Sequence, residues 1–172
     1  NYPNEQFSKQ FVVAGSSGHE EICQYFIDKK VSLNVSVILQ NYKILASKIG
    51  KIILGFLNSV DKKTKEAFSN FFLNEAIIKG NVNLVETLLN KETLDNQALF
   101  NAVRSHNIEI VNKILQCNSK PSFINQMSQE GTALNIAVYN NDLPIVNTLL
   151  SLKEINPSLR SVNGMTPLIV AI

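Results

Sequence analysis

The sequence predicts an all-α protein, an α-solenoid built from stacked helix-turn-helix repeats. Three observations lead to this fold class. Hydrophobic residues make up 45% of the 172 residues, so the chain can bury a sizeable core. Glycine (7) and proline (5) are sparse, although they dominate the turns that a strand-rich protein needs. A spacing pattern also recurs along the chain, and periods of about 20–50 residues are typical of solenoids.

The recurring pattern starts with a small residue. Eight positions later comes an apolar pair, and a second pair follows after a gap of two residues. In a clear copy, Ala137 precedes Ile145-Val146 and Leu149-Leu150. The small-residue position falls at residues 14, 44, 76, 102, 137 and 171, which lie 30, 32, 26, 35 and 34 residues apart. Ile44 replaces alanine in the second copy, which is the least regular.

Each unit is predicted to contain a short helix, a tight turn and a second helix. In five of six copies a large apolar residue lies three positions before the small residue, a spacing that places both on one helical face. The later pairs repeat at i, i+1, i+4 and i+5, which is a wide helical stripe. Breaks containing Gly18, Gly80, His106 or Asn140-Asn141 separate the two helices. Neither helix can bury its apolar face alone, so neighbouring units must stack.

The last copies carry the most specific motif. Residues 164–171 read Gly-Met-Thr-Pro-Leu-Ile-Val-Ala, which resembles the Gly-x-Thr-Pro-Leu-His-x-Ala opening of ankyrin repeats with Ile169 in place of His. Residues 131–137 keep the Thr, Leu and Ala of this opening, and residues 18–23 resemble the Gly-His-x-Glu-Ile-Val junction before the second helix. Three asparagines that follow an apolar residue resemble the step into the family's β-hairpin finger: Asn34, Asn125 and Asn156.

The resemblance implies an ankyrin-type α-solenoid with short or missing β-hairpin fingers. We expect residues 1–172 to form one array. Its approximate repeats are 1–34, 35–66, 67–92, 93–125, 126–157 and a partial repeat at 158–172.

Two repeat boundaries carry further expectations. Fingers should be best preserved at residues 126–130 and 158–163, whereas the short interval from Ala76 to Ala102 predicts a deleted finger, with residues 89–98 as a compact turn. The sixth repeat has no second helix to cover Leu168, Ile169 and Ile172. We therefore expect these side chains to be partly exposed and the natural chain to continue.

No motif for catalysis or for a cofactor is found. A P-loop needs Gly-x-x-x-x-Gly-Lys-Ser/Thr, which no stretch supplies, and the glycines at residues 15–18 do not fit the Gly-x-Ser-x-Gly elbow of hydrolases. His19 and Cys23 are four residues apart, but a metal site needs three or four ligands. We expect no cofactor, no metal and no catalysis, with Cys23 as a small buried hydrophobe and His19 as a turn residue.

Ankyrin-like proteins bind other proteins through a concave surface of fingers and first helices, and the resemblance implies this function here. In the family's register, the exposed concave positions lie two and three residues after the small residue, and the finger tips add to them. The helix positions are Ser16, Ser17, Ile78, Lys79, Arg104, Ser105, Tyr139 and Asn140. The fingers contribute Gln129, Glu130, Val162, Asn163 and Met165.

Tyr139 and Arg104 are the preferred anchors, because Tyr and Arg are enriched among the residues that dominate binding energy. For Tyr139 the alternative is that the side chain packs beside Ala137.

Lysines gather in the second repeat, where six of them accompany one acidic residue, Asp61. The six are Lys43, Lys48, Lys51, Lys62, Lys63 and Lys65. One interpretation is a basic patch for an acidic protein, an anionic lipid or a nucleic acid. We favour a solvated face, because the stretch lacks Arg and the interleaved aromatic residues that stack on bases.

Composition also bears on the cellular setting. The most apolar stretch, residues 44–57, is interrupted by Lys48 and Lys51 and is shorter than the roughly 20 residues that a membrane span needs. Two cysteines make no disulfide scaffold, so a reducing compartment is expected. We expect an intracellular, cytoplasmic protein, or a secreted effector that acts in a host cytosol. A further alternative is that the array is the recognition part of a longer effector, enzyme or degradation adaptor.

Overall fold

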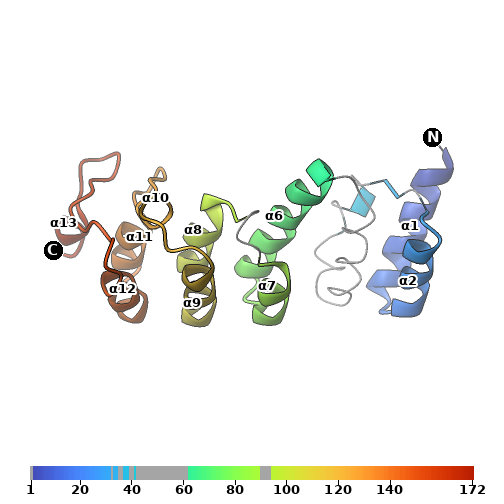
Figure 1. The fold of residues 1–172 in the computed structure, drawn as a ribbon, viewed down its shortest axis with the longest axis horizontal. Helices are drawn as coiled ribbons and strands as arrows, with labels where there is room; N and C mark the ends of the chain where they lie inside the picture. Colours follow the sequence, from blue (N-terminus) through green and yellow to red (C-terminus); the bar gives the residue numbers. More distant parts are fainter. Residues whose placement is uncertain (1, 32, 35–36, 39–40, 42–61, 90–93) are drawn as a thin grey trace. The chain divides into compact units, whose positions relative to one another are not determined.

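The structure is a computed structural model that describes residues 2–31, 33–34, 37–38, 41, 62–89 and 94–172. The chain divides into two compact units, Asn1–Phe72 and Leu73–Ile172, which are described in turn. All regular elements in the described ranges are helices, labelled in Figure 1. The predicted all-α fold class is confirmed.

The first unit contains a helical hairpin of α1 (Tyr2–Ser16) and α2 (Glu20–Asp28). The turn between them passes through Gly18, whose φ of +78° favours glycine. The core between the helices includes Phe11 and Cys23, both buried, and the Cys23 thiol donates to the Phe11 carbonyl oxygen at 3.6 Å. Phe26 packs edge-on against Phe11. Cys23 is therefore a core residue, as expected from the sequence.

The second unit consists of successive hairpins whose helices contact one another in two rows. The second helices of the repeats, α7, α9 and α12, form one row, and the first helices α8, α11 and α13 form the other. Helix α6, which crosses the division between the units, supplies the first helix of the hairpin that contains α7. The bounds are α6 Lys62–Ile78, α7 Val82–Leu88, α8 Asn96–Arg104, α9 Ile108–Cys117, α10 Pro121–Ile124, α11 Ala133–Tyr139, α12 Leu143–Leu150 and α13 Pro167–Val170.

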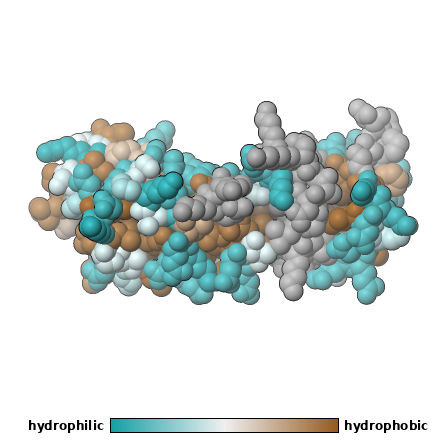
Figure 2. Space-filling view, in the orientation of Figure 1, coloured by the Kyte–Doolittle hydropathy of each residue, from teal (hydrophilic) through white to brown (hydrophobic). Residues whose placement is uncertain are grey.

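The core of the second unit follows the repeat register of the sequence. Ala76, Ala102 and Ala137 at the small-residue position are buried. The leucines three residues before them are buried as well, which confirms this face of the first helices: Leu73, Leu99 and Leu134. The first residue of the first apolar pair is also buried in the three repeats of this unit that contain a second helix, as Leu84, Ile110 and Ile145. Apolar side chains reach the surface along the middle of this unit in Figure 2.

The turns inside the hairpins share one backbone conformation. Gly80, His106 and Asn141 all have positive φ, at +67°, +54° and +54°. The residue after each of them caps the second helix, since the side chains of Asn81, Asn107 and Asp142 accept backbone N–H groups of the first turn. Asn and Asp side chains are preferred at this capping position, so the turn between the two helices of each hairpin is determined by the residues within it.

Two expectations about element length are wrong. The first helices are not uniformly short, because α1 has 15 residues and α6 has 17, against 7 for α11. Residues 89–98 are not wholly a turn either, because α8 begins at Asn96 and the Asp95 side chain caps it by accepting the Ala98 N–H. Residues 90–93 of this segment lie outside the described residues.

The last helix is largely uncovered, as the sequence predicts. Leu168 is 73% exposed, Ile169 44% and Ile172 101%.

Substitution of Ile114 tests the repeat register predicted from the sequence. Its side chain on α9 is fully buried in the row of second helices. We expect Ile114→Ala to lower the free energy of unfolding by about 2–5 kcal/mol, because a buried large-to-small change loses transfer energy and leaves a cavity. Urea unfolding of the variant, with Gln116→Ala on the exposed side of α9 as the control, measures the loss. A variant as stable as the control would show that the register is wrong.

Candidate functional site

Two short loops, the fingers, precede α11 and α13. In the first, Ser128 and Gly131 exchange backbone hydrogen bonds of 2.9 and 3.2 Å, which leaves Gln129 and Glu130 at the tip. In the second, the Ser161 N–H donates to the Met165 carbonyl at 2.8 Å. Its tip is formed by Val162 and Asn163, both exposed. Short fingers were predicted at both places. The second pairing extends past the predicted residues 158–163 to Met165.

Asparagine side chains tie consecutive repeats together beneath the fingers. Asn125 donates to the Glu154 carbonyl at 2.8 Å, and its own amide oxygen accepts the Asn156 N–H at 2.8 Å. Asn135 is buried, and its oxygen accepts from the backbone N–H and the hydroxyl of Thr132, while its NH₂ donates to the Met165 carbonyl at 3.3 Å. These bonds fix the second finger against the preceding repeat.

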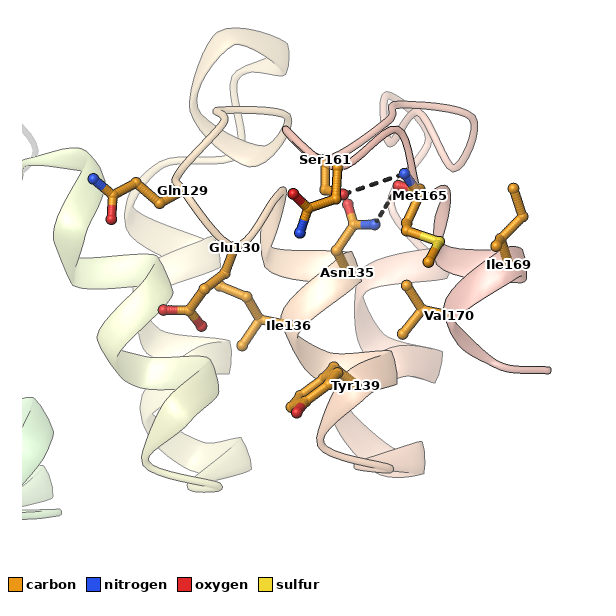
Figure 3. A pocket seen from close by; sticks show the side chains of 10 residues that line it. Gln129, Glu130, Asn135, Ile136, Tyr139, Ser161, Met165, Ile169 and Val170 are labelled. Carbon is orange, nitrogen blue, oxygen red and sulfur yellow. Dashed lines mark hydrogen bonds between the residues drawn. The ribbon is translucent and has the colours of Figure 1, made fainter.

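A hollow of about 610 Å³ lies between the fingers, bounded by α11 on one side and α13 on the other. Figure 3 shows Met165 and Val170 on the α13 side of this hollow, with Ile136 and Tyr139 presented by α11. Tyr139 is 82% exposed, so the alternative that it packs beside Ala137 is wrong. The lining residues are Gln129, Glu130, Asn135, Ile136, Tyr139, Ser161, Asn163, Met165, Ile169 and Val170.

A chain of polar contacts leads from the hollow across the first helices of two preceding repeats. The Arg104 guanidinium contacts both carboxylate oxygens of Glu130, at 2.7 and 3.4 Å, and donates to the Asn101 oxygen at 3.3 Å. Asn101 donates to Asn74 at 2.8 Å. Asn74 in turn donates to both oxygens of Asp95, at 3.3 and 3.2 Å. Since the ion pair is partly exposed, it contributes at most about 1 kcal/mol, and its main effect is to orient Glu130.

The structure brings together five of the predicted site residues at the hollow, namely Gln129, Glu130, Tyr139, Asn163 and Met165. Arg104 is linked to them through Glu130. The other predicted positions do not line the hollow: Val162 is exposed at its finger tip, Ile78 and Lys79 are exposed at the end of α6, Ser105 and Asn140 are the C-caps of α8 and α11, and Ser16 and Ser17 lie in the first unit.

Five lining residues were missed from the sequence. Asn135 was identifiable in principle, because it occupies the His position of the Thr-Pro-Leu-His motif. In the structure its amide oxygen accepts from Thr132 and its NH₂ group donates to Met165. Ile169 occupies the same motif position in the last repeat and carried the same signal. Ile136, Ser161 and Val170 carry no comparable signal, since their sequence positions are those of ordinary core or loop residues.

The lysine-rich stretch falls almost entirely outside what the structure describes. Lys43, Lys48 and Lys51 are not among the described residues, and of Lys62 and Lys63 only the backbone in α6 is described. Lys65 is exposed. No observation therefore favours the basic patch.

The described residues offer little reactive chemistry. No group of three or more His, Cys, Asp or Glu side chains in them could hold a metal ion. Burial raises the pKa of the Cys23 thiol, and the nearby Glu20 carboxylate adds to this shift, so the reactive thiolate is disfavoured. None of the helices in this part of the chain has the length and apolar composition that crossing a membrane requires.

The family model for ankyrin repeats, in three copies, matches residues 99–172. These residues are ankyrin repeats. The match begins within α8 and covers the fingers, the hollow and the helices through α13. Comparison with curated proteins gives no match. Ankyrin repeats generally serve as protein–protein interaction modules.

Substitution of Asn135 tests whether its hydrogen bonds to Thr132 and Met165 stabilise the site. We expect Asn135→Ala to destabilise the protein by about 1–3 kcal/mol, because it leaves the buried Thr132 groups without their acceptor. The Met165 carbonyl also loses one of its two donors and keeps the Ser161 N–H, so backbone amide signals of residues 161–165 should shift in nuclear magnetic resonance (NMR) spectra. Asn147→Ala, on the exposed side of α12, is the control. Equal stability of the two variants would contradict the role given to Asn135.

Proposed function

We propose that this chain binds a partner protein through the surface formed by the two fingers, the hollow between them and the exposed side of α8 and α11. One observation carries the proposal. The hollow gathers five residues that the repeat register had assigned to a binding surface, although they come from three separate segments. The general use of ankyrin repeats as interaction modules supports it.

Tyr139 and Arg104 are the proposed anchors. Tyr139 projects from α11 with 82% of its surface exposed, so a partner can bury a large aromatic area there. The Arg104 guanidinium is oriented by Glu130 and Asn101 before any partner arrives. A side chain already held in place loses less conformational freedom on binding, which favours affinity.

The proposal assigns the chain no catalytic step. It also places the interaction inside a cell, in agreement with the setting expected from composition. Within the described residues, Asn135 and Ser161 at the hollow make bonds that hold the second finger, and the Glu130 carboxylate pairs with Arg104.

The proposal predicts which substitutions weaken binding. A partner is first captured from a cell extract with the intact chain and identified, and its affinity is then measured by calorimetric titration. We expect Tyr139→Ala and Arg104→Ala each to weaken binding by about 1–4 kcal/mol, the range of dominant interface residues.

The controls are Asn147→Ala and Gln116→Ala, on exposed positions of α12 and α9, which should change affinity by less than about 0.5 kcal/mol. Lys113, which the sequence places on the outer side of α9, is unsuitable as a control because it pairs with Glu86 of the preceding repeat at 3.2 Å. Anchor variants that bind as tightly as the controls would contradict the proposal. A steep loss of binding with salt that depends on Lys62, Lys63 and Lys65 would support the basic-patch alternative instead.

A further inference from the structure

We infer that the hollow between the fingers receives an uncharged, bulky apolar side chain, of the leucine, methionine or phenylalanine class, from the partner protein. The inference deepens the proposed function and rests on it, since it specifies what the partner must present. It follows from the apolar lining, from the pairing of its one ionic side chain, Glu130, with Arg104, and from the volume of the hollow.

Much of the apolar part of the lining is partly exposed in the described chain. Met165 and Ile169 are each 44% exposed, and the Tyr139 ring is more exposed still. Val170 is half-buried, and Ile136, only 2% exposed, lies at the floor of the hollow. Removing apolar surface from water is favourable in proportion to its area, so an apolar side chain that covers these residues gains affinity.

Three polar side chains of the lining, Asn135, Ser161 and Glu130, are engaged within the chain, and the lining amides of Gln129 and Asn163 carry no charge. Asn135 uses its oxygen for Thr132 and its NH₂ for the Met165 carbonyl, and the Ser161 hydroxyl accepts the Met165 N–H at 3.3 Å. Glu130, the one ionic side chain in the lining, has both oxygens on Arg104. In Figure 3 the Glu130 carboxylate points toward α8 and away from Met165.

The occupant is therefore uncharged. A lysine or an aspartate that entered the hollow would lose its hydration without finding a free counter-charge, which is costly. A small polar side chain would leave the exposed apolar lining in contact with water. A hollow of about 610 Å³ lies in the range of about 300–1,000 Å³ that encloses small ligands, so it holds one bulky side chain with its adjoining main chain.

The hollow accepts a class of apolar side chains rather than a single one, because Met165 forms part of its lining. Methionine is unbranched and polarizable, so it adapts its shape to different apolar neighbours. The Tyr139 ring on the other side adds a flat contact surface. A hollow with one adaptable wall accepts leucine, methionine or phenylalanine with similar affinity.

The two methionines of the chain provide a direct readout. Met165 lines the hollow, whereas Met127, 37% exposed on the other finger, does not. In protein labelled with ¹³C at the methionine methyl groups, each gives one NMR signal. The probes are the N-acetyl methylamides of leucine, phenylalanine, lysine and aspartate, each titrated separately.

We expect the leucine and phenylalanine probes to shift the Met165 signal in a saturable manner, with a dissociation constant on the order of 1 mM for probes of this size. The Met127 signal should stay in place, and the lysine and aspartate probes should shift neither signal. Three results would overturn the inference: no saturable Met165 shift with either apolar probe, equal shifts at both methionines, or stronger binding of a charged probe.

A matched pair of variants on α13 separates binding in the hollow from a general effect of charge. Ile169→Glu puts a carboxylate into the lining, and we expect it to weaken the leucine probe at least tenfold. Leu168→Glu adds the same charge at the adjacent residue, which is more exposed and outside the lining, and should leave the affinity within about twofold. Equal weakening by both variants would contradict the inference.

Failure of this inference is distinguishable from failure of the proposed function. If the apolar probes bind at Met165 but the captured partner is insensitive to Tyr139→Ala and Arg104→Ala, the proposed function fails while the chemistry of the hollow stands. If the partner depends on both anchors but no apolar probe binds, the surface is correct and the occupant of the hollow is wrong.

Discussion

The stacking of apolar stripes between neighbouring repeats is the interaction on which the second unit depends. Helices of seven to ten residues, such as α7, α9 and α12, are too short to persist alone in water. Each is stabilised because Val85, Ile114 and Ile145, among others, are removed from water by the adjacent hairpin. The positions of the fingers depend on this stack, since the hydrogen bond from Asn135 to the Met165 carbonyl ties the second finger to the preceding hairpin.

The candidate site adds a polar layer to this apolar stack. Asn125 and Asn135 each bond to the backbone of the following repeat, so the spacing of the hairpins sets the spacing of the fingers. Arg104 and Glu130 connect the preceding repeat to the same region. The hollow is thus a product of repeat spacing, and its apolar lining is left exposed because no element of the described chain fills it. Rigid placement of exposed apolar groups is what a binding surface requires.

Much of this fold was predictable from the sequence, because the spacing of small and apolar residues determines which face of each helix is buried. The positions of Ala76, Ala102 and Ala137 predicted the buried face of the first helices. The lengths of α1 and α6 were not predictable in the same way, since they extend well before the small residue in segments without a finger motif. At the site, the register found Tyr139 and Met165 but not Ile169, whose part in the hollow depends on how the second finger folds back.

Hydrogen exchange measured residue by residue tests most directly whether the floor of the hollow belongs to the same stack as the core. The Ile136 N–H donates to Thr132 in the repeat that bears the hollow, and the Val111 N–H donates to Asn107 in the repeat before it. If stacking holds both repeats together, these two amides exchange with similar, high protection, and the amide of the exposed Gln129 at the finger tip exchanges much faster. Exchange of Ile136 as fast as that of Gln129, with Val111 still protected, would contradict the account, because α11 and the fingers would then open independently of the stack.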